Sequence, residues 1–242
     1  MTESPTTRNG LLKAILVIIA SCLWNGVFAQ AAAWKAGAVI SEETLNTVGI
    51  DCFFSSEPLS DDVFRRMQGK SWKADCTLKR SELRYLRLLH RNAGGQAQCG
   101  EMVVNSRIAE RVLRIFRQLF DLNYKIERIV LVDDYGADDE RSMQANNTSA
   151  FNFRTIRGTK RVSKHGCGLA IDLNPRYNPC VKGNHIEPAN GRAYAYRRDG
   201  RTFAYKIDHN DAAYKLFRKE GFSWGGDWKS SKDYQHFEYD LR

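Results

Sequence analysis

No internal repeat and no low-complexity tract occurs in the 242 residues of this chain. A solenoid or an array of small modules is therefore excluded, and we expect one folded domain. The sequence also lacks the spacing of zinc fingers and any module that combines basic and aromatic residues. These absences argue against a nucleic-acid partner, although the formal net charge is +9. Charge of this sign suits the anionic polymers of a cell envelope equally well.

Charged residues are also absent from residues 14–33. Arg8 and Lys13 precede this run and small residues end it, an arrangement that predicts a secretory signal. Two alternatives stay open. Residues 19–22 resemble a lipoprotein cleavage box, which would leave Cys22 lipidated, and the uncharged run is barely long enough to remain in the membrane as an anchor. A cleaved signal, a lipidated Cys22 and a membrane anchor all predict an exported protein of the periplasm or cell envelope. The lipidated Cys22 and the anchor would also attach it to the membrane.

We expect three parts along the chain: a signal peptide or membrane or lipid anchor over 1–30, a connecting arm over 31–57, and a single domain over 58–242. Apolar residues make up 43% of the sequence and charged residues 27%, a balance that can bury a core. Five cysteines lie beyond residue 30, and an odd count leaves at least one thiol unpaired within the monomer. Cys52 lies near Cys76 in sequence, and Cys167 lies near Cys180. This proximity does not establish which cysteines form disulfides.

Local patterns predict helices in the first half of the domain and short strands in the second. Helices are predicted over 60–67, over 81–90, from Asn105 or Ser106 through Leu119, and over 211–220. Strands are predicted over 126–132, 168–174 and 234–241. Between them lies a long polar stretch, residues 133–162, whose acidic run lacks the alternating ligands of a calcium loop. This order favours an α+β domain, in which a small antiparallel sheet packs with N-terminal helices.

The two C-terminal strands carry candidate metal ligands. Alternation in residues 168–174 directs Asp172 to one face, and alternation in residues 234–241 does the same for His236. His165 lies on the loop before the first of these strands and can fold back toward that face. If the strands are neighbours, the three side chains converge. Two imidazoles and one carboxylate leave a fourth tetrahedral position for water, which is how catalytic zinc is held.

Two further carboxylates lie close to these ligands in sequence. Asp233 precedes His236 by three residues, in the turn that leads into the strand, so it can lie beside the metal without binding it. We therefore expect Asp233 to be the general base that takes a proton from the metal-bound water. Glu238 shares the strand face of His236 and is the competing base. We prefer it as the partner that holds an imidazole in place.

The two segments that carry this chemistry resemble the D-alanyl-D-alanine carboxypeptidase family of zinc peptidases. The family includes vancomycin-resistance carboxypeptidases and phage endolysins that cut between L-alanine and D-glutamate. Its terminal element is matched by Asp233 and His236, and the similarity runs from about Phe64 to the C-terminus. Its pattern of Ser, His, Gly, Ala and Asp is matched by Ser163, His165, Gly168, Ala170 and Asp172.

The resemblance implies a peptidase that uses one zinc ion per chain and acts on the stem peptides of bacterial peptidoglycan. It implies His165, Asp172 and His236 as ligands, with Asp233 as the base. It also implies an arginine upstream that holds the substrate and stabilises the developing oxyanion. Arg154 is the best match for that arginine, although Arg157 and Arg161 are close in sequence, and Ser163 is expected to contact the substrate too.

One departure from the family pattern concerns specificity. Carboxypeptidase members generally place Glu at the position of Asp233. The Asp, together with residues 225–228 upstream, looks more like the endopeptidase branch. The resemblance therefore leaves open whether the enzyme removes a terminal D-alanine or cuts between L-alanine and D-glutamate.

Three other interpretations compete with this one. Residues 221–225 fit the nucleophile-elbow pattern around Ser223, but the elbow needs a strand before the serine and a helix after it. A Cys₂His₂ structural zinc site could use His165, Cys167, Cys180 and His185, although it lacks the close cysteine pair typical of such sites. The third alternative is an inactive module of the same fold that binds the cell wall.

Overall fold

The computed structural model describes residues 34–156 and 158–241. Residues from Ala36 onward form a compact unit. The predicted signal or anchor over 1–30, with Cys22, lies outside the described residues, as does Arg157. Within the part that is described, no helix has the length and apolar character needed to cross a membrane.

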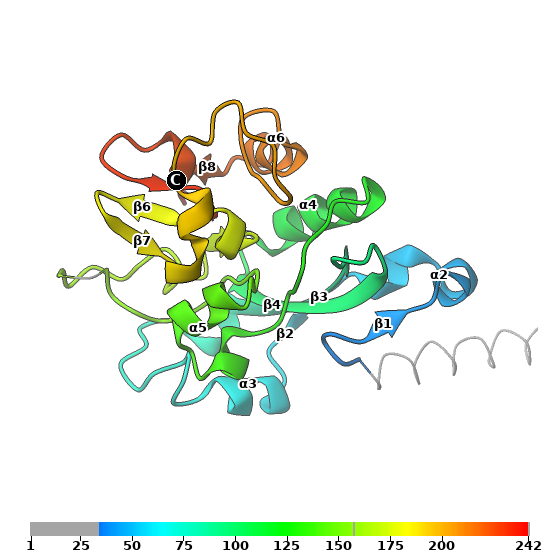
Figure 1. The fold of residues 1–242 in the computed structure, drawn as a ribbon. Coiled ribbons are helices and arrows are strands. Elements are labelled where there is room, and N and C mark those ends of the chain that lie inside the picture. The colour runs from blue at the N-terminus through cyan, green and yellow to red at the C-terminus, as the bar shows by residue number, and fades with distance from the viewer. Residues whose placement is uncertain (1–33, 157, 242) are drawn as a thin grey trace, which may run out of the picture. The chain divides into compact units, whose positions relative to one another are not determined.

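A long β-hairpin forms the centre of the first sheet (Figure 1). Its strands, β3 (Leu83–Arg91) and β4 (Ala97–Asn105), pair antiparallel along their whole length, with Leu83 opposite Asn105. The predicted helix over 81–90 is therefore wrong. Both faces of β3 are covered, because Leu86 and Leu88 join one buried cluster while Leu83 belongs to another. A short apolar run that is buried on both faces does not alternate, and it mimics helical spacing.

Two short strands complete this sheet in the order β1-β4-β3-β2. Strand β1 (Val39–Ile40) pairs with β4, and β2 (Ser55–Pro58) pairs with β3. Helix α2 (Glu42–Val48) lies between them in sequence. The stretch expected to be a connecting arm over 31–57 thus forms two edge strands and a helix where the structure describes it. Strands of two and four residues are too short to show a pattern in the sequence.

Helices pack against the hairpin and against each other. Helix α3 (Asp61–Met67) begins as predicted, because the Ser60 hydroxyl accepts a hydrogen bond from the Val63 amide. Helix α4 (Ala109–Asp121) buries its apolar stripe in the main cluster beside α6 (Ala212–Lys219). The apolar stripe, all of it buried, is Ile108, Val112, Ile115 and Leu119.

The segment after α4 differs from the expected strand over 126–132. Ile126, Ile129 and Leu131 are buried as that pattern indicates. The segment nevertheless makes only isolated bridges, at Lys125 and Arg128, and continues into a short 3₁₀-helix at Val132–Tyr135. Burial alone therefore accounts for the apolar pattern. The segment packs against the hairpin in the main buried cluster without forming a continuous ladder of β-sheet hydrogen bonds.

Two small antiparallel sheets occupy the C-terminal half, which confirms the α+β class. One has the order β5-β10-β8 and the other the order β7-β6-β9. In the first, β10 (His236–Glu238) pairs with β5 (Ala170–Asp172), so that His236 lies opposite Asp172. The strands that remain are β8 (Ser223–Trp224), β6 (Cys180–Lys182), β7 (His185–Glu187) and β9 (Lys232–Asp233).

The polar stretch over 133–162 has secondary structure of its own. It contains helix α5 (Asp139–Gln144), which Asp138 caps through the Arg141 amide. Asn147 is fully buried and its side chain exchanges hydrogen bonds with the backbone of Val130. This stretch is therefore folded and packed against the rest of the domain. All five cysteines in the described part of the chain are free thiols.

Candidate metal centre

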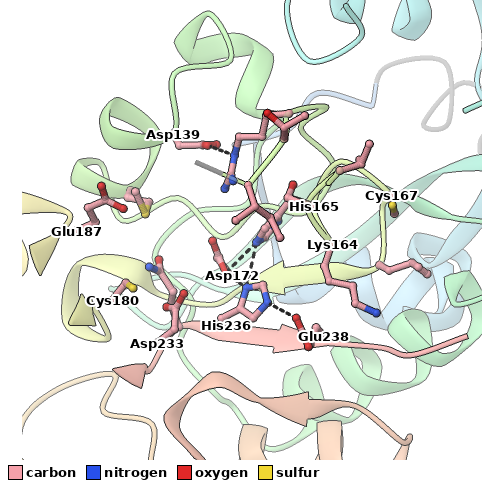
Figure 2. Close-up of a pocket in the computed structure, with 18 of the residues that line it drawn as sticks. Asp139, Lys164, His165, Cys167, Asp172, Cys180, Glu187, Asp233, His236 and Glu238 are labelled. Atoms are coloured by element: carbon pink, nitrogen blue, oxygen red, sulfur yellow. Dashed lines mark hydrogen bonds and ion pairs between the residues drawn. The ribbon is translucent and has the colours of Figure 1, made fainter. Parts of the chain in front are cut away.

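The three predicted ligands meet at one point (Figure 2). His236 Nδ1 lies 3.0 Å from Asp172 Oδ1 and 3.1 Å from His165 Nε2, and the third side of the triangle, His165 Nε2 to Asp172 Oδ1, measures 3.2 Å. The pairing of β5 with β10 places Asp172 and His236 opposite each other. Among the described residues, this is the one group of three or more His, Cys, Asp or Glu side chains that converges closely enough to hold a metal ion.

Hydrogen bonds on the far side of each imidazole determine which nitrogen faces the centre. His165 Nδ1 lies 2.6 Å from the carbonyl oxygen of Ala150, so it carries a proton and donates it. His236 Nε2 lies 3.1 Å from Glu238 Oε2 and donates in the same way. Both inward nitrogens therefore present lone pairs, next to a carboxylate oxygen of Asp172. Three groups that can each donate an electron pair at this spacing suit a cation.

The spacing also fits zinc. Nitrogen and oxygen ligands held tetrahedrally at zinc's usual bond lengths lie roughly 3.3–3.5 Å apart. The observed separations of 3.0–3.2 Å are within a few tenths of an ångström of that range. His165 and His236 are each only 6% exposed. The donor set therefore fits a buried, three-ligand metal site with room for a fourth ligand on the pocket side.

Electrostatics at this point favour positive charge. Burial by itself raises the pKa of Asp172, but His165 and His236 lower it well below its usual range. Burial opposes protonation of His236, whereas contacts with Asp172 and Glu238 raise its pKa to about 10. Both shifts show that the carboxylates stabilise a cationic partner between them. The same negative potential would stabilise a bound metal ion.

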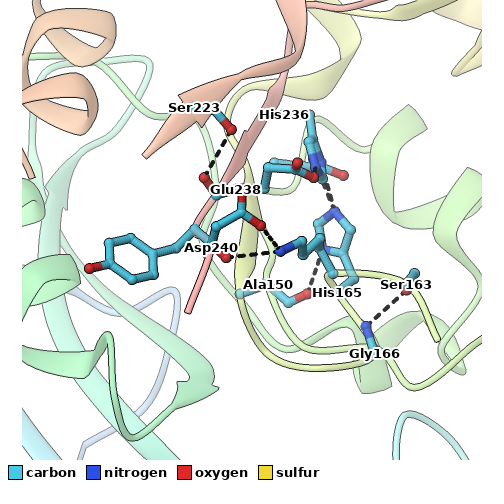
Figure 3. A network of polar contacts seen from close by, with 11 residues as sticks. Ala150, Ser163, His165, Gly166, Ser223, His236, Glu238 and Asp240 are labelled. Atoms are coloured by element: carbon cyan, nitrogen blue, oxygen red, sulfur yellow. Dashed lines mark hydrogen bonds and ion pairs between the residues drawn. The ribbon is translucent and has the colours of Figure 1, made fainter. Parts of the chain in front are cut away.

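The polar stretch before the site holds two of the three ligands. Ser149 exchanges two backbone hydrogen bonds with Asp172, of 2.9 and 3.1 Å, which fixes the end of β5. The next residue, Ala150, supplies the carbonyl that orients His165 (Figure 3). These contacts could not be read from residue types, because a backbone carbonyl has no sequence signature. The Asn-Asn-Thr-Ser run at residues 146–149 was the available hint.

The turn that carries His165 depends on two local features. Ser163 accepts a 2.9 Å hydrogen bond from the Gly166 amide, and its own side chain is buried (Figure 3). Gly168 has φ +66°, and a Cβ there would come within 2.7 Å of the Asn105 amide nitrogen. Glycine is therefore required at this position. Ser163 lines the pocket as well, but its hydroxyl serves this turn, and a substrate contact stays a prediction.

Asp233 lies beside the triad on β9, opposite Cys180 of β6 (Figure 2). Burial, countered by His236 and reinforced by Asp172, raises the pKa of Asp233 to about 6. Its Oδ1 atom is buried and has no hydrogen-bond partner among the described residues. A Cβ on Gly225 would lie 2.6 Å from the Asp233 carbonyl oxygen, so that glycine allows the close approach. Asp233 is thus next to the ligands without being one of the converging three.

A pocket of about 1150 Å³ opens above the triad. Arg154 and Arg161 both line it. Arg154 forms an ion pair with Asp139, and Asp139 also accepts a 2.7 Å hydrogen bond from the Asn152 side chain. The Asp139 carboxylate therefore holds the Arg154 guanidinium at the wall of the pocket. Asp139 belongs to the acidic run of residues 133–162, and its sequence context gave no sign of this contact.

The competing site predictions are not supported by the geometry. His185 is exposed and pairs with Glu187 at 2.6 Å, so the proposed Cys₂His₂ set does not assemble. Ser223 lies on β8 after helix α6, and a 3₁₀ turn follows it, which is the wrong context for a nucleophile elbow. Its hydroxyl donates to the Glu238 carbonyl at 3.3 Å.

Comparison with known proteins agrees with the geometry. Residues 157–239 match the model of a family described as D-alanyl-D-alanine carboxypeptidase. A search of curated proteins and a search of solved structures each found no match. The matched range contains all three converging residues as well as Asp233 and Glu238, whereas Arg154 precedes it. The predicted resemblance is confirmed over residues 157–239, which match the model of this family.

Proposed function

We propose that this protein is a zinc-dependent peptidase that hydrolyses D-amino-acid-containing peptides of bacterial peptidoglycan. The observation that carries the proposal is the triangle of His165 Nε2, His236 Nδ1 and Asp172 Oδ1, with sides of 3.0–3.2 Å, at the base of a large pocket. The family match supports a peptidase of this class. One ion per chain follows from the single convergent set among the described residues.

The reaction in this proposal is attack of water on the scissile carbonyl. A bound zinc ion would supply the Lewis acidity that polarises the carbonyl and acidifies the attacking water. Asp233 takes a proton from the water as the new C–O bond forms. It returns that proton to the nitrogen as the C–N bond breaks, which leaves a carboxylate and an amine. Because Asp233 is buried with one free oxygen, it is placed for this exchange.

Two further roles complete the proposal. Glu238 accepts from His236 Nε2, so it keeps the ring in the tautomer whose Nδ1 faces the centre. Arg154, held by Asp139, offers its guanidinium to a substrate carboxylate or to the developing oxyanion. Arg161 lines the same pocket and is the alternative. Asp233 in place of Glu leaves both the carboxypeptidase and the L-alanyl-D-glutamate endopeptidase reaction within the proposal.

The proposed place of action is the cell envelope. The N-terminal pattern of Arg8, Lys13 and the uncharged residues 14–33 supports export, with or without a lasting membrane or lipid anchor. The proposed partner is the peptidoglycan stem peptide. The excess of basic residues suits that anionic polymer.

A two-part experiment tests the function. Purified protein should contain one zinc per chain by elemental analysis, and it should release defined peptide fragments from purified peptidoglycan, identified by mass spectrometry. Each candidate bond leaves a different fragment, so the digest also decides between the two reactions. Stoichiometric zinc without any released fragment would favour an inactive wall-binding module, and absence of zinc would remove the basis of the proposal.

A further inference from the structure

Gln235 is a buried polar residue at the site to which the proposed reaction assigns no role. It lies in the turn between β9 and β10, directly between Asp233 and His236 in sequence. Gln235 is 2% exposed, yet it lines the pocket. Its backbone carbonyl accepts a 3.0 Å hydrogen bond from the Leu173 amide, which ties the turn to the end of β5. The main chain at Gln235 is therefore fixed beside the site.

The two ends of the Gln235 amide have different surroundings. The donor end hydrogen-bonds to the Asp233 carboxylate, because an ionised carboxylate only accepts, and this contact offsets part of the rise in the pKa of Asp233 that burial causes. The acceptor end, Oε1, is buried and has no hydrogen-bond partner among the residues that the structure describes. A buried acceptor without a partner is unfavourable by about as much as a lost hydrogen bond. Such an atom beside a pocket indicates a donor that arrives with the ligand.

Asp233 Oδ1, which belongs to the nearby carboxylate, is another buried acceptor without a partner among the described residues. Asp233 ends strand β9 and Gln235 lies in the turn that follows, and both residues line the same pocket. A substrate peptide bond offers one donor at the scissile position, its N–H group. After cleavage the same nitrogen becomes an amine, with more hydrogens to donate.

We propose that Gln235 Oε1 accepts a hydrogen bond from the nitrogen of the scissile peptide bond and holds that nitrogen beside Asp233. This assignment rests on the proposed peptidase function and adds a residue on the leaving-group side of the substrate. One end of the Gln235 amide orients the base, and the other end orients the atom that the base must protonate. The proton then moves from Asp233 to the nitrogen as the C–N bond breaks.

The experiment replaces the atom on each side of the contact. Gln235→Met keeps the length of the side chain and removes both the donor and the acceptor. The substrate change replaces the scissile N–H by an ester oxygen, which cannot donate. The probes are diacetyl-L-lysyl-D-alanyl-D-alanine and its D-lactate ester for carboxypeptidase action. For endopeptidase action they are N-acetyl-L-alanyl-D-glutamate and its 2-hydroxyglutarate ester.

Gln235→Met should lower kcat/KM for the amide by about tenfold to a hundredfold, the scale of an unpaired buried hydrogen-bonding group. Cleavage of the ester should fall about tenfold less than cleavage of the amide, because the ester reaction loses only the contact with Asp233 and never makes the contact with the scissile N–H. Zinc content and Tm should match the wild type. Gln118→Met, on helix α4 away from the pocket, is the matched control and should leave both substrates unaffected.

Equal losses on the amide and the ester would overturn the inference, because Gln235 would then act only through Asp233 or through the fold. No loss on either would overturn it as well. If Gln235→Met does not fold, Gln235→Asn withdraws the acceptor by one methylene and must shift the amide-to-ester ratio in the same direction. A wild type that cleaves neither amide would refute the peptidase function itself, whereas an active wild type with an unchanged ratio in the variant refutes only the role of Gln235.

Discussion

Glu238→Gln and Asp233→Asn should separate the orientation of a metal ligand from general-base catalysis. Glu238 Oε2 lies 3.1 Å from His236 Nε2, on the side of the ring that faces away from the centre. Asp233 adjoins the triad but has one carboxylate oxygen with no partner in the described structure. The first substitution should therefore act on metal affinity, and the second on the chemical step.

The magnitude for Glu238 follows from the contact that it makes. Partners of this kind typically contribute tenfold to a hundredfold in metal affinity, or about 1.4–2.7 kcal/mol. Glu238→Gln keeps an acceptor oxygen and loses only its charge, so we expect a loss near tenfold. Glu238→Leu removes the acceptor as well, and the loss should approach a hundredfold. Excess zinc should restore much of the activity of both variants.

Asp233→Asn should leave zinc affinity within about threefold of the wild type, because Asp233 is not one of the three converging residues. The variant keeps the size of the side chain and removes its capacity to take a proton. General-base catalysis contributes about a hundredfold to ten-thousandfold, and kcat should fall by at least the lower figure. Added zinc should not restore it.

The assay is a zinc competition titration with a chromophoric chelator at fixed pH, run beside steady-state kinetics with and without added zinc. Folding of each variant is checked by Tm. The contrary outcome is that Asp233→Asn binds zinc weakly and recovers in excess metal while Glu238→Gln binds normally and stays inactive. In that case the two carboxylates have exchanged roles.

Four other perturbations test separate parts of the structure. His165→Ala should lose zinc and activity together, and unchanged metal content by elemental analysis would disprove the site. Arg154→Ala should keep zinc while kcat/KM drops about a hundredfold or more; a larger loss in Arg161→Ala would reassign the role. Gly225→Ala should disturb Asp233, since the added Cβ would lie 2.6 Å from the Asp233 carbonyl oxygen. We therefore expect a clear loss of kcat with a smaller effect on stability, measured as Tm. Burial lowers the pKa of His90 to about 4, below its unfolded value near 6.5, so the unfolded state binds more protons between these pH values. The free energy of unfolding should therefore drop by about 3 kcal/mol from pH 6.5 to pH 4, and urea titrations of His90→Gln should show a flatter pH dependence.

The site was predictable from the sequence where a local period determined the direction of side chains. Alternation in residues 168–174 and 234–241 assigned Asp172 and His236 to the same face, and β5 and β10 pair so that the two lie opposite each other. The capping residue Ser60 and the apolar stripe of α4 were predictable for the same reason. Each of these features depends on residues within a few positions of one another.

Predictions of secondary structure failed where a segment is buried on both faces or is too short to show the periodic spacing of its apolar residues. The segment at 81–90 is covered on both faces, so its apolar residues have no alternation, and it forms strand β3. Residues 126–132 are buried by packing and do not pair continuously. Strands β1 and β2 are two and four residues long, and their pairing partners lie more than 20 residues away.

The amino-acid sequence by itself therefore determined which residue types can bind a metal and which strand face they occupy. Only the tertiary structure decided which nitrogen of each imidazole faces the centre, because that depends on the Ala150 carbonyl and the Glu238 carboxylate. It likewise decided that Asp139 holds Arg154 and that Gln235 keeps a free acceptor beside Asp233. The physical reason is that a hydrogen bond requires two atoms within about 3 Å in a specific orientation. Residue identity determines the capacity for that contact, and the packed chain determines the partner.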